Sequence, residues 1–378
     1  MTFNYFRKIF EKGAEALTYT KFLYVKNGKL RKYNGAAEEL FIQGGEIKNI
    51  GESAFSKCKT LKKITVSGVE YIDEHAFYAC PLLESVELIN VKTVCDLAFD
   101  ACRKLKTVIL GEGLGEIRYS AFRGCTSLEN INIPKSVADI GPGVFFGCKS
   151  LKTIALAEDN KHFVFKGNCL IKTCGKLIVA GLDYPEIPED AADTIGFYAF
   201  VGRKLPKTFV IPEGINTIQF MSFCDCEGAI EIKLPESLLF IGSNAFSDCK
   251  TLKKINIPKD VRVIGECAFM GCEALSEITV PSELRIIESH TFAFCSSLKS
   301  VKIESGVEQI RDHAFECCDS LTSIYIPRSV HTIYEYAFYA CKNLKDVYCE
   351  ADSKPDSWDE KWLEGCTATV HFGAYKRS

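Results

Sequence analysis

A phenylalanine recurs at a nearly constant interval along most of this chain, and in most copies a cysteine follows three residues later. Successive phenylalanines are separated by 22, 22, 23 and 23 residues, then by 55, then by 23 six times. They are Phe55, Phe77, Phe99, Phe122, Phe145, Phe200, Phe223, Phe246, Phe269, Phe292, Phe315 and Phe338. A period in the twenties is typical of a solenoid, in which each coil covers the apolar face of its neighbour. The repeat constrains architecture far more than chemistry, because solenoids are mostly binding surfaces.

Apolar residues recur at fixed positions within each coil. With the phenylalanine as position 0, an aliphatic residue stands at −5, usually a leucine at +6, and aliphatic residues at +9 and +11. In the coil of Phe246 these are Ile241, Leu252, Ile255 and Ile257. The alternation at +9 and +11 predicts a short strand with one buried face. The segment around Ala-Phe and Cys has no alternation, and we expect a helical or 3₁₀ turn there, on the opposite side of the coil.

The recurring elements AFxxC, LxxIxIP and IGxxAF resemble the BspA-like leucine-rich repeat family of bacterial and protozoan proteins over roughly residues 40 to 350. The resemblance implies a right-handed leucine-rich-repeat solenoid with a parallel sheet lining one face, and a role in adhesion or protein recognition. It implies no catalytic residues. Because each coil combines a strand with an expected helical turn on the opposite side, the expected class is an α/β repeat of about twelve coils of 22–23 residues. The coil of Phe200 departs from the pattern, with Arg203 in place of the cysteine and Pro206 in place of the leucine.

The 55-residue interval holds a normal coil plus about 32 extra residues. Phe163 to Gly181 alternates on both sides of Thr173-Cys174-Gly175 and predicts an inserted β-hairpin. Either this hairpin only packs along the edge of the solenoid or it projects and shapes a binding surface.

Both ends of the chain predict caps that cover the terminal coils. Asn27-Gly28 between two alternating arms, from Phe22 to Tyr33, predicts a hairpin, and 2–17 fits a short amphipathic helix. At the other end, 356–366 contains both tryptophans and predicts a helix, followed by a last strand at 368–372. The expected domains are an N-terminal cap (1–39), a solenoid (40–350) with the hairpin at about 157–190, and a C-terminal cap (351–378).

Charge and cysteine content bear on compartment and partner. The net charge of −3 provides no basic face of the kind that nucleic acid requires, and no apolar run is long enough to predict a membrane span. Eleven of the 19 cysteines stand at +3. The Cα–Cβ bonds of neighbouring cysteines in such a column run parallel and do not converge as a disulfide requires, so we expect reduced, structural thiols. Free thiols and the lack of a secretory-signal pattern favour the cytoplasm, whereas the family resemblance implies the cell surface or secretion.

Some residues are candidates for metal binding or catalysis. His290 and His313 stand at −2 in adjacent coils, with Cys267 at −2 in the coil before, so stacking could let them share a metal ion. Residues at the same position elsewhere include Ser, Leu, Tyr, Met and Asn, which favours an ordinary variable surface column. Cys174 and the pair Cys317-Cys318 are the thiols most open to catalysis, but only His313 lies near one as a possible base. We therefore assign no catalytic residue, cofactor or metal ligand.

The outward positions of the strand, +8 and +10, are the remaining candidates for function. They are variable, as expected either of a solvated sheet face or of a binding surface. Tyr325 and Tyr348 are the best anchors because tyrosine is enriched at interface hot spots. The candidate binding residues are Asn132, Lys233, Lys254, Asn256, Glu277, Lys302, Tyr325 and Tyr348.

The sequence thus favours a non-enzymatic, monomeric module that recognises a protein or a glycan along the sheet face, as in adhesion. A structural or self-assembling scaffold is the main alternative. A cysteine- or metal-dependent enzyme is the more remote one.

Overall fold

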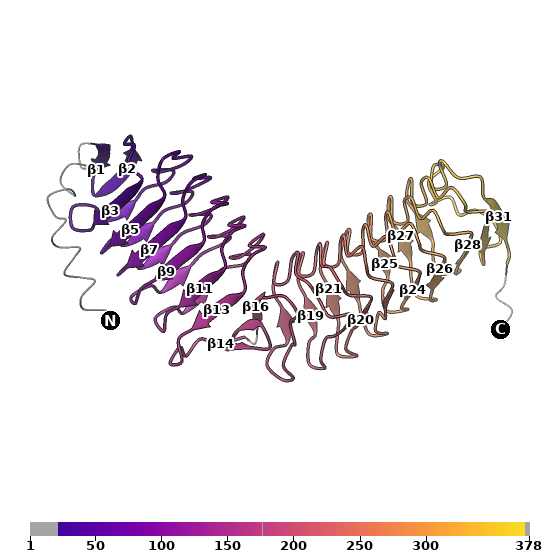
Figure 1. The fold of residues 1–378 in the computed structure, drawn as a ribbon. Coiled ribbons are helices and arrows are strands. Elements are labelled where there is room, and N and C mark those ends of the chain that lie inside the picture. The colour runs from indigo at the N-terminus through magenta and orange to yellow at the C-terminus, as the bar shows by residue number, and fades with distance from the viewer. Residues whose placement is uncertain (1–21, 176, 375–378) are drawn as a thin grey trace. The chain divides into compact units, whose positions relative to one another are not determined.

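The computed structural model describes residues 22–175 and 177–374. They form two compact units, divided between Phe165 and Lys166 and each built of stacked coils (Figure 1). The described residues make about 15 turns of a parallel-sheet solenoid, slightly more than the twelve coils marked by phenylalanines. The difference arises partly because other residues stand in the phenylalanine position at the ends. The helix expected over 2–17 lies outside the described residues.

The first unit contains two sheets of parallel strands, a long-strand sheet and a short-strand sheet. The long-strand sheet has the order β13-β11-β9-β7-β5-β3 and contains β3 (Glu39–Gln43), β5 (Lys63–Ser67), β7 (Ser85–Ile89), β9 (Thr107–Leu110), β11 (Asn130–Ile133) and β13 (Thr153–Leu156). The short-strand sheet has the order β2-β4-β6-β8-β10-β12 and contains β2 (Lys29–Tyr33), β4 (Asn49–Ile50), β6 (Tyr71–Ile72), β8 (Thr93–Val94), β10 (Glu116–Ile117) and β12 (Asp139–Ile140). β1 (Leu23–Lys26) pairs antiparallel with β2, which confirms the hairpin predicted at Asn27-Gly28.

The second unit repeats this arrangement. Its long strands are β18 (Thr208–Val210), β20 (Glu231–Lys233), β22 (Lys254–Ile255), β24 (Glu277–Val280), β26 (Ser300–Ile303), β28 (Ser323–Ile326), β30 (Asp346–Cys349) and β31 (Thr369–Phe372). Its short strands are β17 (Thr194–Ile195), β19 (Thr217–Ile218), β21 (Phe240–Ile241), β23 (Val263–Ile264), β25 (Ile286–Ile287), β27 (Gln309–Ile310) and β29 (Thr332–Ile333). β15 (Cys169–Lys172) and β16 (Leu177–Gly181) pair antiparallel and confirm the inserted hairpin, while β14 (Phe163–Lys166) spans the division between the units.

Register between coils follows the repeat and places like residues side by side. Ile241 pairs with Ile264 in the short strands, and Ile232 pairs with Ile255 in the long strands. All four side chains are buried, as the aliphatic pattern predicts. Each buried side chain of this size contributes about 1.5–3 kcal/mol, and it obtains that burial from the coils on either side.

The segment around each phenylalanine is a chain of turns, and the described residues contain no α-helix. In the coil of Phe246, Asn244 and Asp248 have φ of 56° and 58°, and such left-handed residues two before and two after the phenylalanine interrupt any helix. The 3₁₀-type bonds are present, since the Cys249 amide donates to the Phe246 carbonyl at 3.3 Å. The Phe246 amide instead donates to the Ala268 carbonyl of the next coil at 2.8 Å. The α component of the expected α/β class is therefore replaced by a wall of turns bonded from coil to coil.

The phenylalanine rings stack into a column inside each unit. In the second unit, from Phe200 to Phe338, consecutive ring centroids lie 5.0–5.5 Å apart with interplanar angles of 0–15°. The cysteine at +3 completes this packing, because its thiol donates to the phenylalanine carbonyl of the preceding coil. Cys249 donates to Phe223 at 3.1 Å, and Cys295 donates to Phe269 at 3.3 Å. Each thiol is thus both a small filler and a hydrogen-bond donor.

The predicted C-terminal helix at 356–366 is wrong, because this segment forms a further, degenerate coil. Leu363 stands in the phenylalanine position: the Cys366 amide donates to its carbonyl at 3.0 Å, and the Cys366 thiol donates to the carbonyl of Phe338 at 2.8 Å. The strand expected after it is present as β31, parallel to β30. Trp358 and Trp362 are buried against the end of the column. The domain boundaries expected from the sequence stay a prediction.

In the coil of Phe200, Arg203 is buried at the cysteine position, and Leu205, one residue earlier than the pattern, fills the leucine site. The coil therefore keeps its place in the stack. Within the described residues, no helix is long and apolar enough to cross a membrane.

Candidate functional site

The candidate residues from the sequence lie on the outward face of the long-strand sheets, but they are not equally available. Asn132 bridges to the preceding coil: its amide group donates to the Leu110 carbonyl at 2.6 Å and accepts from the Leu110 amide at 2.9 Å. Asn256 makes the same pair of bonds with Leu234, at 3.2 and 3.1 Å. Both asparagines extend the pairing between coils, so their amide groups are occupied by the backbone.

The charged candidates on the second unit's sheet face are exposed. Lys254 lies 3.5 Å from the Glu231 carboxylate of the adjacent coil, and Lys302 pairs with Glu304. Lys233 and Glu277 are exposed on β20 and β24. Exposed pairs of this kind contribute at most about 1 kcal/mol to stability, so these side chains can exchange partners at little cost.

The two tyrosines form a row with a residue that sequence reasoning missed. Strand register places Tyr325 beside Tyr348, and Tyr348 beside His371. We call Tyr325, Tyr348 and His371 the aromatic row. The Tyr348 and His371 rings stack at 4.8 Å with an interplanar angle of 16°, and Tyr348 is 39% exposed. The same register continues to Lys302, beside Tyr325.

Carboxylates hold the ends of the aromatic row. The Tyr325 hydroxyl donates to Glu350 Oε1 at 2.5 Å, and the His371 Nε2 lies 2.8 Å from Asp346 Oδ1. Glu350 also accepts the backbone amide of Arg328 at 2.8 Å. Because the rings are fixed by these contacts, little side-chain entropy remains to be lost when a partner packs on them.

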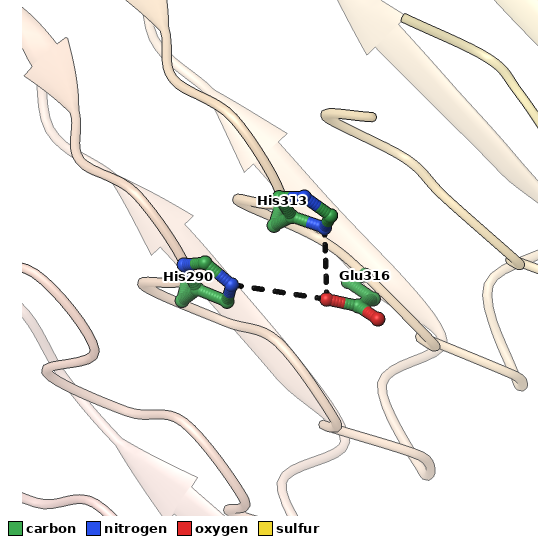
Figure 2. Close-up of side chains that lie close together, drawn as sticks. All are labelled: His290, His313 and Glu316. Carbon is green, nitrogen blue, oxygen red and sulfur yellow. Dashed lines mark ion pairs between the residues drawn. The ribbon is translucent and has the colours of Figure 1, made fainter. Parts of the chain in front are cut away.

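The histidine pair lies on the turn side of the second unit (Figure 2). The rings of His290 and His313 stack with centroids 4.8 Å apart and an interplanar angle of 10°. Glu316, one residue after Phe315, points its carboxylate at both rings: Oε2 lies 2.9 Å from His313 Nδ1 and 3.9 Å from His290 Nε2. Sequence reasoning missed Glu316, since it compared only the −2 column. Cys267, which it included, is not a member of the group.

Cys317 and Cys318 do not have the surroundings of a nucleophile. Burial raises the pKa of Cys317, and the nearby carboxylates of Glu316 and Asp319 raise it further. Burial raises the pKa of Cys318 as well. A reactive cysteine requires a lowered pKa and an electropositive setting, and His313, the only candidate base, faces Glu316. Cys174 is exposed in the turn between β15 and β16.

Comparison with protein-family models gives one match over both units. The model of the BspA type leucine rich repeat region, in six copies, matches residues 33–152, 72–175, 193–295 and 263–368. The chain belongs to the BspA-type leucine-rich repeat family. The first match begins at Tyr33, the residue that stands in the phenylalanine position of the first coil and stacks on Phe55 at 5.0 Å. BspA-type repeats are protein-interaction and recognition modules in general, and they are typically non-enzymatic.

Three solved structures of bacterial proteins are similar to this chain. A leucine-rich repeat protein of Eubacterium ventriosum is 23% identical, with a TM-score of 0.67 over 80% of this chain and 90% of its own. The pneumococcal vaccine antigen PcpA is 17% identical, with a TM-score of 0.64 over 92% of each chain. A leucine rich cell surface protein of Faecalibacterium prausnitzii is 24% identical, with a TM-score of 0.51 over 87% of this chain and 92% of its own. These likenesses establish the BspA-type solenoid fold. A comparison with curated protein sequences finds no match.

Proposed function

We propose that this BspA-type chain is a non-enzymatic recognition module that binds a protein partner through the aromatic row on the second unit's long-strand sheet. The observation that carries the proposal is the stack of Tyr348 on His371, beside Tyr325 in register. Large, rigid and partly exposed aromatic rings are the side chains that most often anchor protein interfaces. The pneumococcal antigen and the cell surface protein with the same fold are compatible with an exposed, partner-binding role.

The charges around the aromatic row favour a protein over a glycan. Lys302 and Arg328 lie next to the row with their positive charges, while Asp346 and Glu350 contribute negative ones. A polar rim of both signs around an aromatic centre is the usual composition of a protein–protein interface. A partner segment with an apolar side chain flanked by both charge types would complement this patch. Adhesion through this face is the biological role that follows.

The absence of a role in catalysis is part of the proposal. It is supported by the raised pKa of the Cys317 and Cys318 thiols. We also propose a monomer, because both end coils depart from the repeat. β1 pairs antiparallel with β2 at the first coil, and Leu363 replaces the phenylalanine in the last one. Sedimentation equilibrium at several concentrations should give one monomer mass; a mass that rises with concentration would favour the scaffold alternative.

The proposal is tested by selecting peptide ligands from a phage-displayed library against the full chain and, in parallel, by screening a glycan array. We expect peptides whose affinity falls at least tenfold, about 1.4 kcal/mol, with Tyr348→Ala or Tyr325→Ala. Ile109→Ala is the matched control, because Ile109 is 47% exposed at the same +10 position on β9 of the first unit. Selected peptides that ignore both tyrosine variants, or binding to glycans alone, would overturn the proposal.

A further inference from the structure

We propose that His290, His313 and Glu316 form a binding site for a divalent transition-metal ion of the zinc type. The site is on the turn side of the second unit and is separate from the aromatic row, so it does not depend on the proposed function. It would join two adjacent coils through their side chains. The group offers two imidazole nitrogens and one carboxylate oxygen, all within 4.8 Å of one another.

The backbone holds the two histidines in position before any ion binds. Both residues have left-handed φ, 56° at His290 and 55° at His313, and both occupy the −2 position of their coils. The His290 amide donates to the Asp312 carbonyl of the next coil at 3.2 Å, so the spacing of the two rings is fixed by the main chain. Pre-positioned ligands lower the entropic cost of closing a metal site.

Glu316 reaches the same point from the other side of the phenylalanine. Its amide donates to the His313 carbonyl at 3.1 Å, which closes the turn and brings its side chain back over His313. The carboxylate is 15% exposed, whereas the His290 and His313 side chains are 35% and 27% exposed. The carboxylate therefore lies inside the group and the imidazoles border solvent (Figure 2).

The distances suit tetrahedral coordination with one open position. Bonds of about 2.0–2.1 Å from zinc place neighbouring ligand atoms roughly 3.3 Å apart. The Glu316 oxygen lies 2.9 Å from His313 Nδ1 and 3.9 Å from His290 Nε2, on either side of that value. The three ligand atoms lie within 4.8 Å of one another, so side-chain rotations must also bring the two imidazole nitrogens closer together as the ion binds. Two histidines and one glutamate are also a common set of protein ligands for zinc, with water in the fourth position.

The His313 ring brings an unsatisfied nitrogen to the group that already holds His290 and Glu316. Its Nδ1 is shielded from solvent and makes no hydrogen bond of acceptable geometry, although the carboxylate is near. A shielded nitrogen without a directed partner is costly, and a metal ion would satisfy it. Tyr336 and Tyr339 enclose the ring, with centroids 5.2 and 6.3 Å away, so one side of the site is apolar.

The test is calorimetric titration of the metal-stripped full chain with ZnCl₂ at neutral pH, followed by absorption spectroscopy with Co²⁺. We expect one equivalent of zinc to bind, and His290→Asn, His313→Asn or Glu316→Gln to weaken that binding at least tenfold. Asparagine tolerates left-handed φ, and Asn244 already holds this position in another coil. Co²⁺ should show d–d bands without a thiolate charge-transfer band.

The matched control is His75→Asn in the first unit. His75 has the same −2 position, a φ of 53° and an equally shielded, unbonded Nδ1. Its ring neighbour is Tyr78, its Nε2 lies 3.8 Å from the Glu74 carboxylate, and among the described residues it has no second histidine in such a group. Zinc binding should be unchanged in this variant. Absence of zinc uptake, equal affinity in the ligand variants and the wild type, or a thiolate band would overturn the metal site. None of these results bears on peptide binding at the aromatic row.

Discussion

The thiol of Cys272 donates a hydrogen bond to the carbonyl oxygen of Phe246, 3.2 Å away in the preceding coil. The same contact recurs between successive coils, for example from Cys318 to Phe292 at 3.3 Å. It explains why a cysteine recurs at +3, because the residue there must both fill the column and donate a hydrogen bond. The thiol donates a second hydrogen bond to a carbonyl oxygen that already accepts one from a backbone amide of its own coil.

Removing one column thiol should destabilise the second unit. Cys272→Ala deletes the hydrogen bond and leaves a small void, so we expect a loss of about 1–3 kcal/mol in the free energy of unfolding. Guanidinium unfolding followed by circular dichroism measures it. Cys174→Ala, at an exposed turn, should leave the midpoint unchanged; equal midpoints for both variants would contradict a structural role of the column.

Alkaline pH should destabilise the fold through the same thiols. Burial raises the pKa of Cys295 from 9.0 to about 12. The unfolded chain therefore loses this proton first, and the stability contribution, complete below pH 9, declines as pH rises from about 9 toward 12. Each such thiol adds a slope of about 1.4 kcal/mol per pH unit. Unfolding measured between pH 8 and 10.5 should show a slope that is shallower in Cys295→Ser, with the difference approaching that amount above pH 9. An unchanged slope would contradict a raised pKa of Cys295.

Two phenylalanines of one coil differ sharply in burial, one in the phenylalanine column and one two residues later in the turn. Phe292 is fully buried, and Phe294, two residues later, is 44% exposed with a φ of 62°. We expect Phe292→Ala to cost about 3–5 kcal/mol. Phe294→Gly should change stability by less than about 1 kcal/mol, because glycine relieves the left-handed backbone. Thermal unfolding of both variants measures this; a larger loss for Phe294→Gly would contradict the assignment of the turn.

Thiol reactivity of the native protein should be confined to few sites. Burial keeps column thiols such as Cys125 protonated by raising the pKa, and it also blocks access. Cys174 is the exposed cysteine of the described residues. Iodoacetamide labelling followed by mass spectrometry should modify Cys174 first, and Cys174→Ser should remove the fast phase. Fast labelling of Cys125 in the folded state would show that the column is open.

The solenoid could be predicted because its apolar positions repeat. Ile241 and Ile264 stand at the same place in their coils, and parallel pairing follows from that identity. The wall of turns could not be predicted in the same way. The left-handed residues at −2 include Leu97 and Met221, and neither residue type indicates a left-handed backbone as glycine does. The sequence pattern therefore allowed a helical turn.

The candidate site, too, could be predicted from the sequence only in part. Tyr325 and Tyr348 share the +10 position of successive coils, and the strand register places them side by side. His371 was missed because Leu363 replaces the phenylalanine, and Val370 follows it by seven residues instead of nine. Whether these residues bind a partner stays a prediction.

The most direct measurement of recognition at the aromatic row is site-specific photocross-linking. A photoreactive phenylalanine analogue placed at Tyr348 should yield a discrete covalent adduct with a selected peptide ligand, whereas the same analogue at Ile109, equally outward on the first unit's sheet, should yield none. Adducts from position 109 and none from position 348 would contradict the account.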